Sequence, residues 1–122
     1  QSLSPIMLDE TYVFCTVVGA SYGDYAEAAP IASYQEHEGL TLVLTKERAD
    51  ASELGYEGLF SCISLQVHSN LESVGLTAVV AGKLAAYEIS ANIIAGYYHD
   101  HVFVPQARAS EAFGLLRDLN KV

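Results

Sequence analysis

The sequence predicts an α+β fold in which antiparallel β-sheets carry helices on one face. Short apolar runs rich in β-branched and aromatic residues alternate with amphipathic stretches, which indicates a mixture of strands and helices. The order strand, helix, strand, strand, helix occurs twice along the chain. A split β-α-β order of this kind builds an antiparallel sheet with its helices on one side. We therefore expect a duplicated fold, with one half in residues 1–58 and the other in residues 59–122.

The charge of the chain excludes several classes of partner. The 122 residues include 15 acidic and 6 basic side chains, for a formal charge of -9. This negative field repels polyanions, and no apolar run approaches the roughly 20 residues that cross a bilayer, so we expect no nucleic-acid and no membrane partner. The stretch after Gln1 lacks the basic and long apolar regions of a secretory signal. We expect a cytoplasmic protein in which Gln1 results from processing or trimming.

The first half contains three predicted strands, at residues 11–18, 31–37 and 40–45. Small residues follow the first strand up to Pro30, with room for a turn or one short helical piece. Glu38 and Gly39 form a turn signal, so the second and third strands make a hairpin. Thr45 can then cap a short helix over residues 46–54.

The second half begins with a predicted strand at residues 60–67 and a helix at residues 68–87. Ser69 and Glu72 have capping-box spacing, which favours a helix start at that loop. The apolar stripe of this helix is formed by Leu76, Val80, Leu84 and Tyr87. This face is expected to pack on a sheet.

A hairpin and a last helix complete the second half. The hairpin covers residues 91–104 and is predicted to turn at His99 and Asp100, and Pro105 begins the helix. The apolar stripe of the last helix is formed by Ala109, Ala112, Phe113, Leu116 and Leu119. No fourth strand follows, and an open sheet edge invites aggregation. Residues 3–8, the partner half or a second chain are candidates to cover that edge.

An alignment of the halves supports an internal duplication. Cys15 aligns with Cys62, whereas Arg48 aligns with Arg108 across a longer spacing. The extra residues lie between the first and second strands, so the first half has its first helix cut to a stub.

Several side chains could carry chemistry, but the patterns around them favour structural roles. Cys15 and Cys62 lack metal-ligand spacing, and we favour two buried free thiols over a disulfide or a reactive site. His99 and His101 point the same way in a strand, yet two ligands do not close a metal site. No nucleophile elbow or nucleotide-binding glycine pattern is present. We expect no catalytic residue, no bound metal and no cofactor.

The loop over residues 67–77 has the features of a small-ligand site. It leads from a strand into a helix, where unpaired N–H groups can receive a carboxylate. Gly75 permits close approach by a ligand or by the neighbouring strand, and Asn92 offers an amide that donates and accepts. Together they could hold an amino acid. Alternatively, Ser69 only caps the helix and Gly75 only packs.

Two motifs resemble the ACT domain family, whose members are small βαββαβ regulatory modules that bind amino acids. The motifs are Val74-Gly75-Leu76-Thr77 after a strand and Ile89-Ser90-Ala91-Asn92-Ile93-Ile94. The chain is similar, over nearly its whole length, to small stand-alone bacterial proteins with two tandem ACT-like halves. The resemblance implies a duplicated ferredoxin-like fold, as in the regulatory regions of aspartokinases. It places the ligand at Ser69, Val74, Gly75, Leu76, Asn92 and Ile93.

Three functional hypotheses follow. The first is a non-catalytic regulatory sensor that binds an amino acid or a similar small metabolite, in a protein that could form a homodimer as ACT units commonly do. The second is a ligand-free module that pairs with another ACT-containing chain. The third is a small hydrolase or metal-dependent enzyme that uses His68, His99 and His101. Amino-acid-binding ACT loops often have an acidic residue before the glycine, and His68 and Ser69 stand near that place here, so the resemblance does not identify the ligand.

Overall fold

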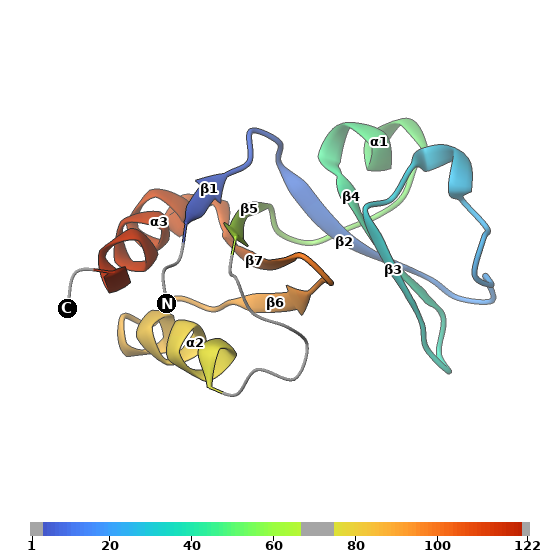
Figure 1. The fold of residues 1–122 in the computed structure, drawn as a ribbon. Coiled ribbons are helices and arrows are strands. Elements are labelled where there is room, and N and C mark those ends of the chain that lie inside the picture. The colour runs from blue at the N-terminus through green and yellow to red at the C-terminus, as the bar shows by residue number, and fades with distance from the viewer. Residues whose placement is uncertain (1–3, 67–74, 121–122) are drawn as a thin grey trace. The chain divides into compact units, whose positions relative to one another are not determined.

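The computed structural model describes residues 4–66 and 75–120. It divides into two compact units (Figure 1). Unit 1 combines residues 1–9 with residues 60–122, and unit 2 is formed by residues 10–59. The predicted domains, residues 1–58 and 59–122, stay a prediction. Within the described residues, no helix is long and apolar enough to cross a membrane.

Unit 2 is built on three antiparallel strands in the order β3-β4-β2. These are β2 (Tyr12–Val17), β3 (Ala32–Gln35) and β4 (Leu40–Thr45). The N–H group of Glu36 donates to the carbonyl of Gly39 at 2.9 Å, which closes the turn between β3 and β4. The three predicted strands and their hairpin are confirmed.

Two short helical segments complete unit 2. The 3₁₀ turn η1 (Ala26–Ala28) lies in the predicted stub, and α1 (Lys46–Ala51) follows β4. The Thr45 hydroxyl accepts a hydrogen bond from the Arg48 N–H at 3.3 Å, so the predicted cap is confirmed. The helix ends before residue 54 because Glu53 adopts a left-handed φ of 57°. The core of unit 2 contains Val13, Cys15, Ala28, Leu40, Leu42, Leu44 and Ala49.

Unit 1 has four antiparallel strands in the order β6-β7-β5-β1. Their bounds are β1 (Pro5–Met7), β5 (Phe60–Gln66), β6 (Asn92–Ala95) and β7 (His99–Pro105). The edge beside β5 is covered by β1, and the Leu8 N–H donates to the Cys62 carbonyl at 3.0 Å. The first of the three candidates for this edge, residues 3–8, is therefore confirmed. Pro5 is tolerated there because an edge strand does not need every N–H group.

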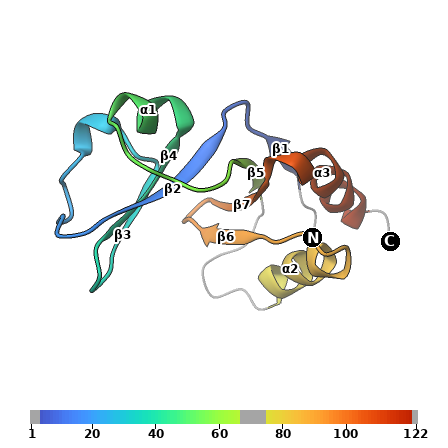
Figure 2. The same cartoon turned by 180° about the vertical axis from the view of Figure 1, so that it is seen from behind.

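The helices α2 (Leu76–Ala86) and α3 (Ala109–Arg117) lie beside the strands of unit 1 (Figures 1 and 2). The 3₁₀ turns η2 (Gln106–Arg108) and η3 (Asp118–Asn120) flank α3. Both helices contribute to one core on one face of the sheet, so the predicted α+β fold with helices on one face is confirmed. This core includes Ile63, Leu65, Val80, Leu84, Val102, Val104, Ala112 and Leu116.

The first helix of the second half differs from its prediction at both ends. It begins at Leu76 rather than at residue 68, because Gly75 adopts a left-handed φ of 94° that a helix cannot contain. The capping pattern of Ser69 and Glu72 lies outside the described residues. Tyr87, predicted to lie on the buried stripe, follows the helix and is 47% exposed. The Lys83 ammonium lies 5.5 Å from the centre of its ring.

The hairpin of unit 1 turns earlier than predicted. The Gly96 N–H donates to the His99 carbonyl at 2.8 Å, and His99 and Asp100 are already part of β7. The predicted turn at these two residues is wrong. Asp is common in turns, but here it pairs with Ala95 and Leu65 inside the sheet.

The register of the strands corrects the alignment of the two halves by one residue. Cys15 lies opposite Leu42 in unit 2, and Ile63 lies opposite Val102 in unit 1. Since Leu42 aligns with Val102, the counterpart of Cys15 is Ile63 and not Cys62. Cys15 and Ile63 both belong to the cores under the helices, whereas Cys62 lies on the alternate face of its strand.

Candidate functional site

Four of the six predicted ligand residues lie in the described part of unit 1. Gly75 is exposed just before α2, and a Cβ built on it meets no atom of residues 4–66 and 75–120 within 4 Å. Leu76 and Ile93 are partly buried against the same core, and Asn92 is exposed at the start of β6. Ser69 and Val74 lie outside the described residues. The fold therefore brings Leu76 and Ile93 to the core of unit 1. The ligand site as a whole stays a prediction.

The start of α2 provides the backbone donors that the prediction needs. The first i to i-4 hydrogen bond runs from the Val79 N–H to the Gly75 carbonyl at 3.0 Å. The N–H groups of Leu76, Thr77 and Ala78 therefore have no acceptor within the helix. Gly75 has no side chain to cap them, and the first turn contains no acidic residue. This helix end favours an anionic group such as a carboxylate.

The two histidines of β7 lie on the same face of the strand. Their ring centres are 6.4 Å apart. Nδ1 of His101 lies 3.1 Å from the Ile94 carbonyl, so it donates there when protonated and holds the hairpin. Nδ1 of His99 is buried without a hydrogen-bond partner among the described residues. Within residues 4–66 and 75–120, no group of three or more potential ligands is arranged to hold a metal ion.

Both cysteines are free and buried, as the sequence predicts. Burial raises the pKa of the Cys15 thiol, and it raises the pKa of the Cys62 thiol to about 11. Both thiols are therefore protonated at neutral pH. Because the thiolate is the reactive form, neither residue is poised as a nucleophile.

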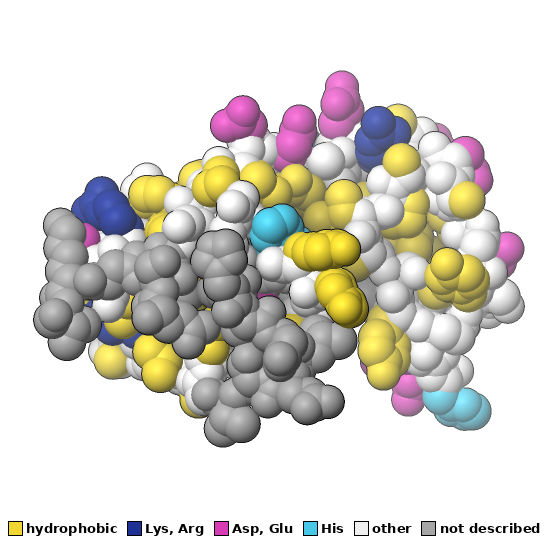
Figure 3. Space-filling model, viewed as in Figure 1, with side chains coloured by type: hydrophobic (Ala, Val, Ile, Leu, Met, Phe, Trp, Pro, Cys, Tyr) yellow, Lys and Arg dark blue, Asp and Glu magenta, His cyan; other side chains and the backbone are white. Residues whose placement is uncertain are grey.

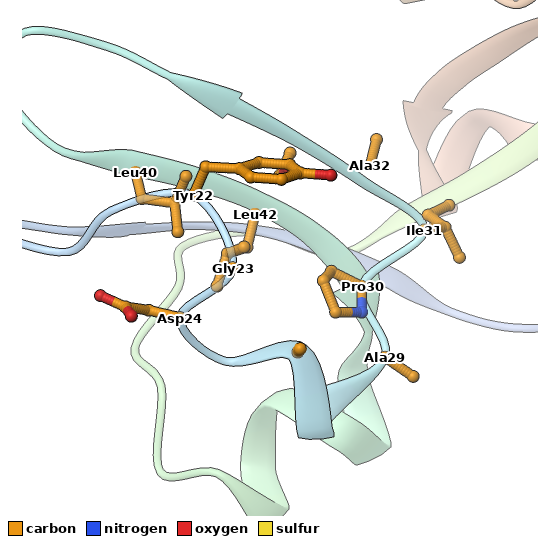
Figure 4. Close-up of a pocket in the computed structure, with 11 residues that line it drawn as sticks. Tyr22, Gly23, Asp24, Ala29, Pro30, Ile31, Ala32, Leu40 and Leu42 are labelled. Atoms are coloured by element: carbon orange, nitrogen blue, oxygen red, sulfur yellow. The ribbon is translucent and has the colours of Figure 1, made fainter.

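Unit 2 contains a pocket of about 530 Å³ (Figure 4). The sequence did not predict this pocket. Leu40 and Leu42 of β4 line its buried side, with exposed fractions of 0% and 1%. Figure 4 shows Asp24 at one end and Ile31 at the other. The ring of Tyr22 lies alongside the two leucines, and its hydroxyl points toward Ala32. The two leucines lie beneath the surface of the pocket, and its exposed lining includes Tyr22 and Ile31, which are 79% and 51% exposed.

The loop over this pocket is held by the side chain of Gln35. The Tyr22 N–H donates to Gln35 Oε1 at 2.6 Å, and Gln35 Nε2 donates to the Ala20 carbonyl at 3.1 Å. Gly23, Tyr25 and Ala29 have left-handed φ values of 99°, 66° and 52°, which bend the chain back over the sheet. The loop places Ala28, which is 4% exposed, in the core of unit 2, so it covers the face of the sheet in place of the shortened helix. No local sequence motif signals the pocket.

Acidic side chains dominate the surface charge. Figure 3 shows them at several separate places on one face of the molecule, with Lys and Arg at few. This distribution agrees with the formal charge of -9.

Two family models match the chain. Both are described as ACT domain, and they match residues 1–61 and 60–118. No curated protein sequence matches.

The solved structures that are similar to this chain include the following three. A protein of unknown function from Vibrio cholerae, described as a possible transport protein, is 54% identical, with 94% of this chain and 88% of that chain covered and a TM-score of 0.85. A protein from Agrobacterium tumefaciens is 16% identical, with 97% and 89% covered and a TM-score of 0.79. The ligand-free regulatory subunit of aspartate kinase from Thermus thermophilus is 14% identical, with 95% and 94% covered and a TM-score of 0.66.

Proposed function

This chain belongs to the ACT domain family, and on that premise we propose that it is a non-catalytic regulatory protein that binds an amino acid or a similar small metabolite. The two ACT matches and the fold shared with an aspartate kinase regulatory subunit support a regulatory role with a small ligand. The raised pKa values of both thiols argue against a cysteine nucleophile. We further propose that the protein acts in the cytoplasm without a cofactor.

The proposed ligand site comprises Ser69, Val74, Gly75, Leu76, Asn92 and Ile93. The observation that carries it is the open backbone at Gly75, in front of a helix whose first N–H groups have no acceptor within the helix. These donors would receive the α-carboxylate, and the Asn92 amide would bind the α-amine. In unit 2 the counterpart of Asn92 is Ala32, because each pairs with the matching residue of the next strand, Phe103 or Val43. We therefore assign this amino-acid site to unit 1 alone.

A thermal-shift panel of the common amino acids tests this proposal. A ligand at about a hundred times its Kd stabilises a protein by about 2.7 kcal/mol, which raises the Tm of a domain this small by several degrees. We expect a shift from one amino acid or from one chemical subset. The shift should be lost in Gly75→Ala and in Asn92→Ala.

The matched control is Gly19→Ala. Gly19 also has a left-handed φ, of 84°, and open space around a built Cβ, so the backbone strain is comparable while the site is untouched. This variant should keep the full ligand shift. A flat panel with folded protein, or equal affinity in all three variants, would contradict the proposal.

A ligand-free pairing module is the second candidate function. Tyr97 and Tyr98 at the hairpin turn are 74% and 76% exposed, and their rings form an edge contact at 5.0 Å. Exposed aromatic side chains are enriched at protein interfaces. A flat ligand panel together with a homodimer in light scattering that Tyr97→Ser disrupts would favour this function.

A further inference from the structure

The hairpins of the two units turn at matching positions but carry different side chains there. The turn over residues 36–39 of unit 2 matches the turn over residues 96–99 of unit 1, because the strand pairs before them share one register. In each turn the N–H of the first residue donates to the carbonyl of the fourth, at 2.9 and 2.8 Å. The middle residues are His37 and Glu38 in unit 2, and Tyr97 and Tyr98 in unit 1. Since His and Glu complete a matching turn, the fold does not require the two tyrosines.

Both tyrosine rings are presented to solvent in a fixed arrangement. Tyr97 and Tyr98 are 74% and 76% exposed, and their rings form an edge contact with 61° between the planes. Below the turn, Nδ1 of His101 lies 3.1 Å from the Ile94 carbonyl on the other strand of the hairpin. Rings held in this way lose little conformational entropy when a partner binds. Two exposed rings with no role in the core indicate a contact surface.

We propose that Tyr97 and Tyr98 form a docking surface for a basic segment of another protein, with an arginine side chain placed against the rings. The proposal goes beyond the amino-acid site and does not depend on it, because neither tyrosine belongs to that site. The charge around the rings and the electronic character of the rings select this partner.

The charge of the hairpin and of the chain favours a cationic partner. Residues 92–105 include one acidic side chain, Asp100, and no Lys or Arg. The formal charge of -9 attracts a basic segment and repels an acidic one. The face of an aromatic ring carries partial negative charge, so it binds a guanidinium or an ammonium group directly. The chain already contains one such contact, between Lys83 and the ring of Tyr87.

A second copy of this chain is the rival occupant, and its charge disfavours it. Two chains that each carry a charge of -9 repel one another. In the part of the chain that the structure describes, Lys46, Arg108 and Arg117 pair with acidic side chains, and Lys83 lies over Tyr87. A second copy therefore has few cations left to place on the rings.

Chemical-shift titrations of the ¹⁵N-labelled full chain test the proposal. The probe is a short capped glycine peptide that carries two arginines, and the control peptides carry citrulline or glutamate at the same positions. Citrulline keeps the shape of arginine but has no charge. We expect the arginine peptide to shift the amide signals of Tyr97 and Tyr98 with saturation. The two control peptides should leave these signals unchanged at equal concentration.

Ring variants separate a contact with the ring face from simple apolar contact. An exposed cation–π contact accounts for about two- to fivefold in affinity. Tyr97→Leu combined with Tyr98→Leu keeps apolar surface but removes both rings, and it should weaken binding of the arginine peptide about fivefold or more. Phenylalanine at both positions keeps the rings and should change the affinity less than about twofold.

The matched control is Tyr34→Leu, which removes a tyrosine of unit 2 that is 73% exposed. It should leave the affinity for the arginine peptide unchanged. Thermal unfolding of every variant checks that the fold is intact.

Four results would overturn the proposal. They are the absence of a saturable shift with the arginine peptide in folded protein, equal binding of the citrulline peptide, an equal shift at the turn of His37 and Glu38, and full affinity in the double leucine variant. Concentration-dependent shifts of Tyr97 and Tyr98 in the protein alone, with a dimer in light scattering, would assign the surface to a second copy instead. The amino-acid site is read separately from the signals of Gly75 and Asn92, so the failure of either proposal is distinguishable from that of the other.

Discussion

The two units use the same strand frame but cover it differently. In unit 1, α2 places Val80 and Leu84 on the sheet, with exposed fractions of 1% and 0%. In unit 2, a loop with one 3₁₀ turn takes the place of this helix. Hydrogen bonds of the Gln35 side chain hold this loop to β3. Strand register and the helix after the third strand are kept in both. The first helix of an ACT unit can thus be replaced by a loop that keeps the sheet covered, since Ala28 of the loop is buried in the core.

The helices of the two units also begin differently. Thr45 caps α1 with its hydroxyl, whereas Gly75, at the start of α2, has no side chain to do so. The Thr45 hydroxyl satisfies one N–H group of α1 within the fold, and Gly75 satisfies none in this way at α2. Unit 2 therefore has a helix start that is capped by its own side chain, whereas α2 of unit 1 begins after a residue without one.

The largest expected effect tests whether α2 is part of the core of unit 1. Leu84→Ala removes a fully buried side chain and should lower the free energy of unfolding by about 2–5 kcal/mol. Val79→Ala on the same helix, where Val79 is 55% exposed, is the matched control and should cost less than about 1 kcal/mol. Urea unfolding measures both. Similar small losses would show that α2, like the loop of unit 2, only covers the sheet.

A prediction of intermediate size concerns β1, the strand of unit 1 that comes from the N-terminal segment. Met7 packs against the core, whereas Ile6 on the alternate face of β1 is 44% exposed. Met7→Ala should lower the free energy of unfolding by about 1–2 kcal/mol, and Ile6→Ala by less than about 0.5 kcal/mol. The two variants are compared by urea unfolding. Equal losses would indicate that β1 does not lie on the sheet with this register.

The last effect distinguishes the two cysteines; it is absent at neutral pH and appears only at high pH. Burial raises the pKa of Cys62 from 9.0 to about 11. The folded state therefore binds this proton more tightly than the unfolded state, and the resulting stability is present below pH 9 and is lost as the pH rises toward 11. The wild-type protein should lose more stability over this range than Cys62→Ala. Cys15→Ala should show a difference of the same sign, since burial also raises the pKa of Cys15. Parallel pH profiles of wild type and Cys62→Ala would contradict this.

Most strands could be predicted because their signals are local. The alternation in residues 40–45 and the capping hydroxyl of Thr45 each depend on a few neighbouring residues, and the structure confirms them. The hairpin turn at Gly96 was missed because Asp100 is a common turn residue, and only pairing with Leu65 shows that it belongs to a strand. Of the predicted ligand residues, Gly75 and Asn92 are in exposed positions where a ligand could reach them. No local sequence motif indicates the pocket of unit 2.

The sequence by itself determined the class of fold, the duplication and the position of the shortened helix, since periodicity and turn chemistry are properties of short stretches. Tertiary structure alone decided the register of the halves, the strand that covers the edge of β5 and the pocket of unit 2. A shift of one residue turns every side chain of a strand to the other face, and for this reason Cys15 corresponds to Ile63 rather than to Cys62. Edges and cavities depend on which distant segments meet, and no single stretch of the chain contains that information.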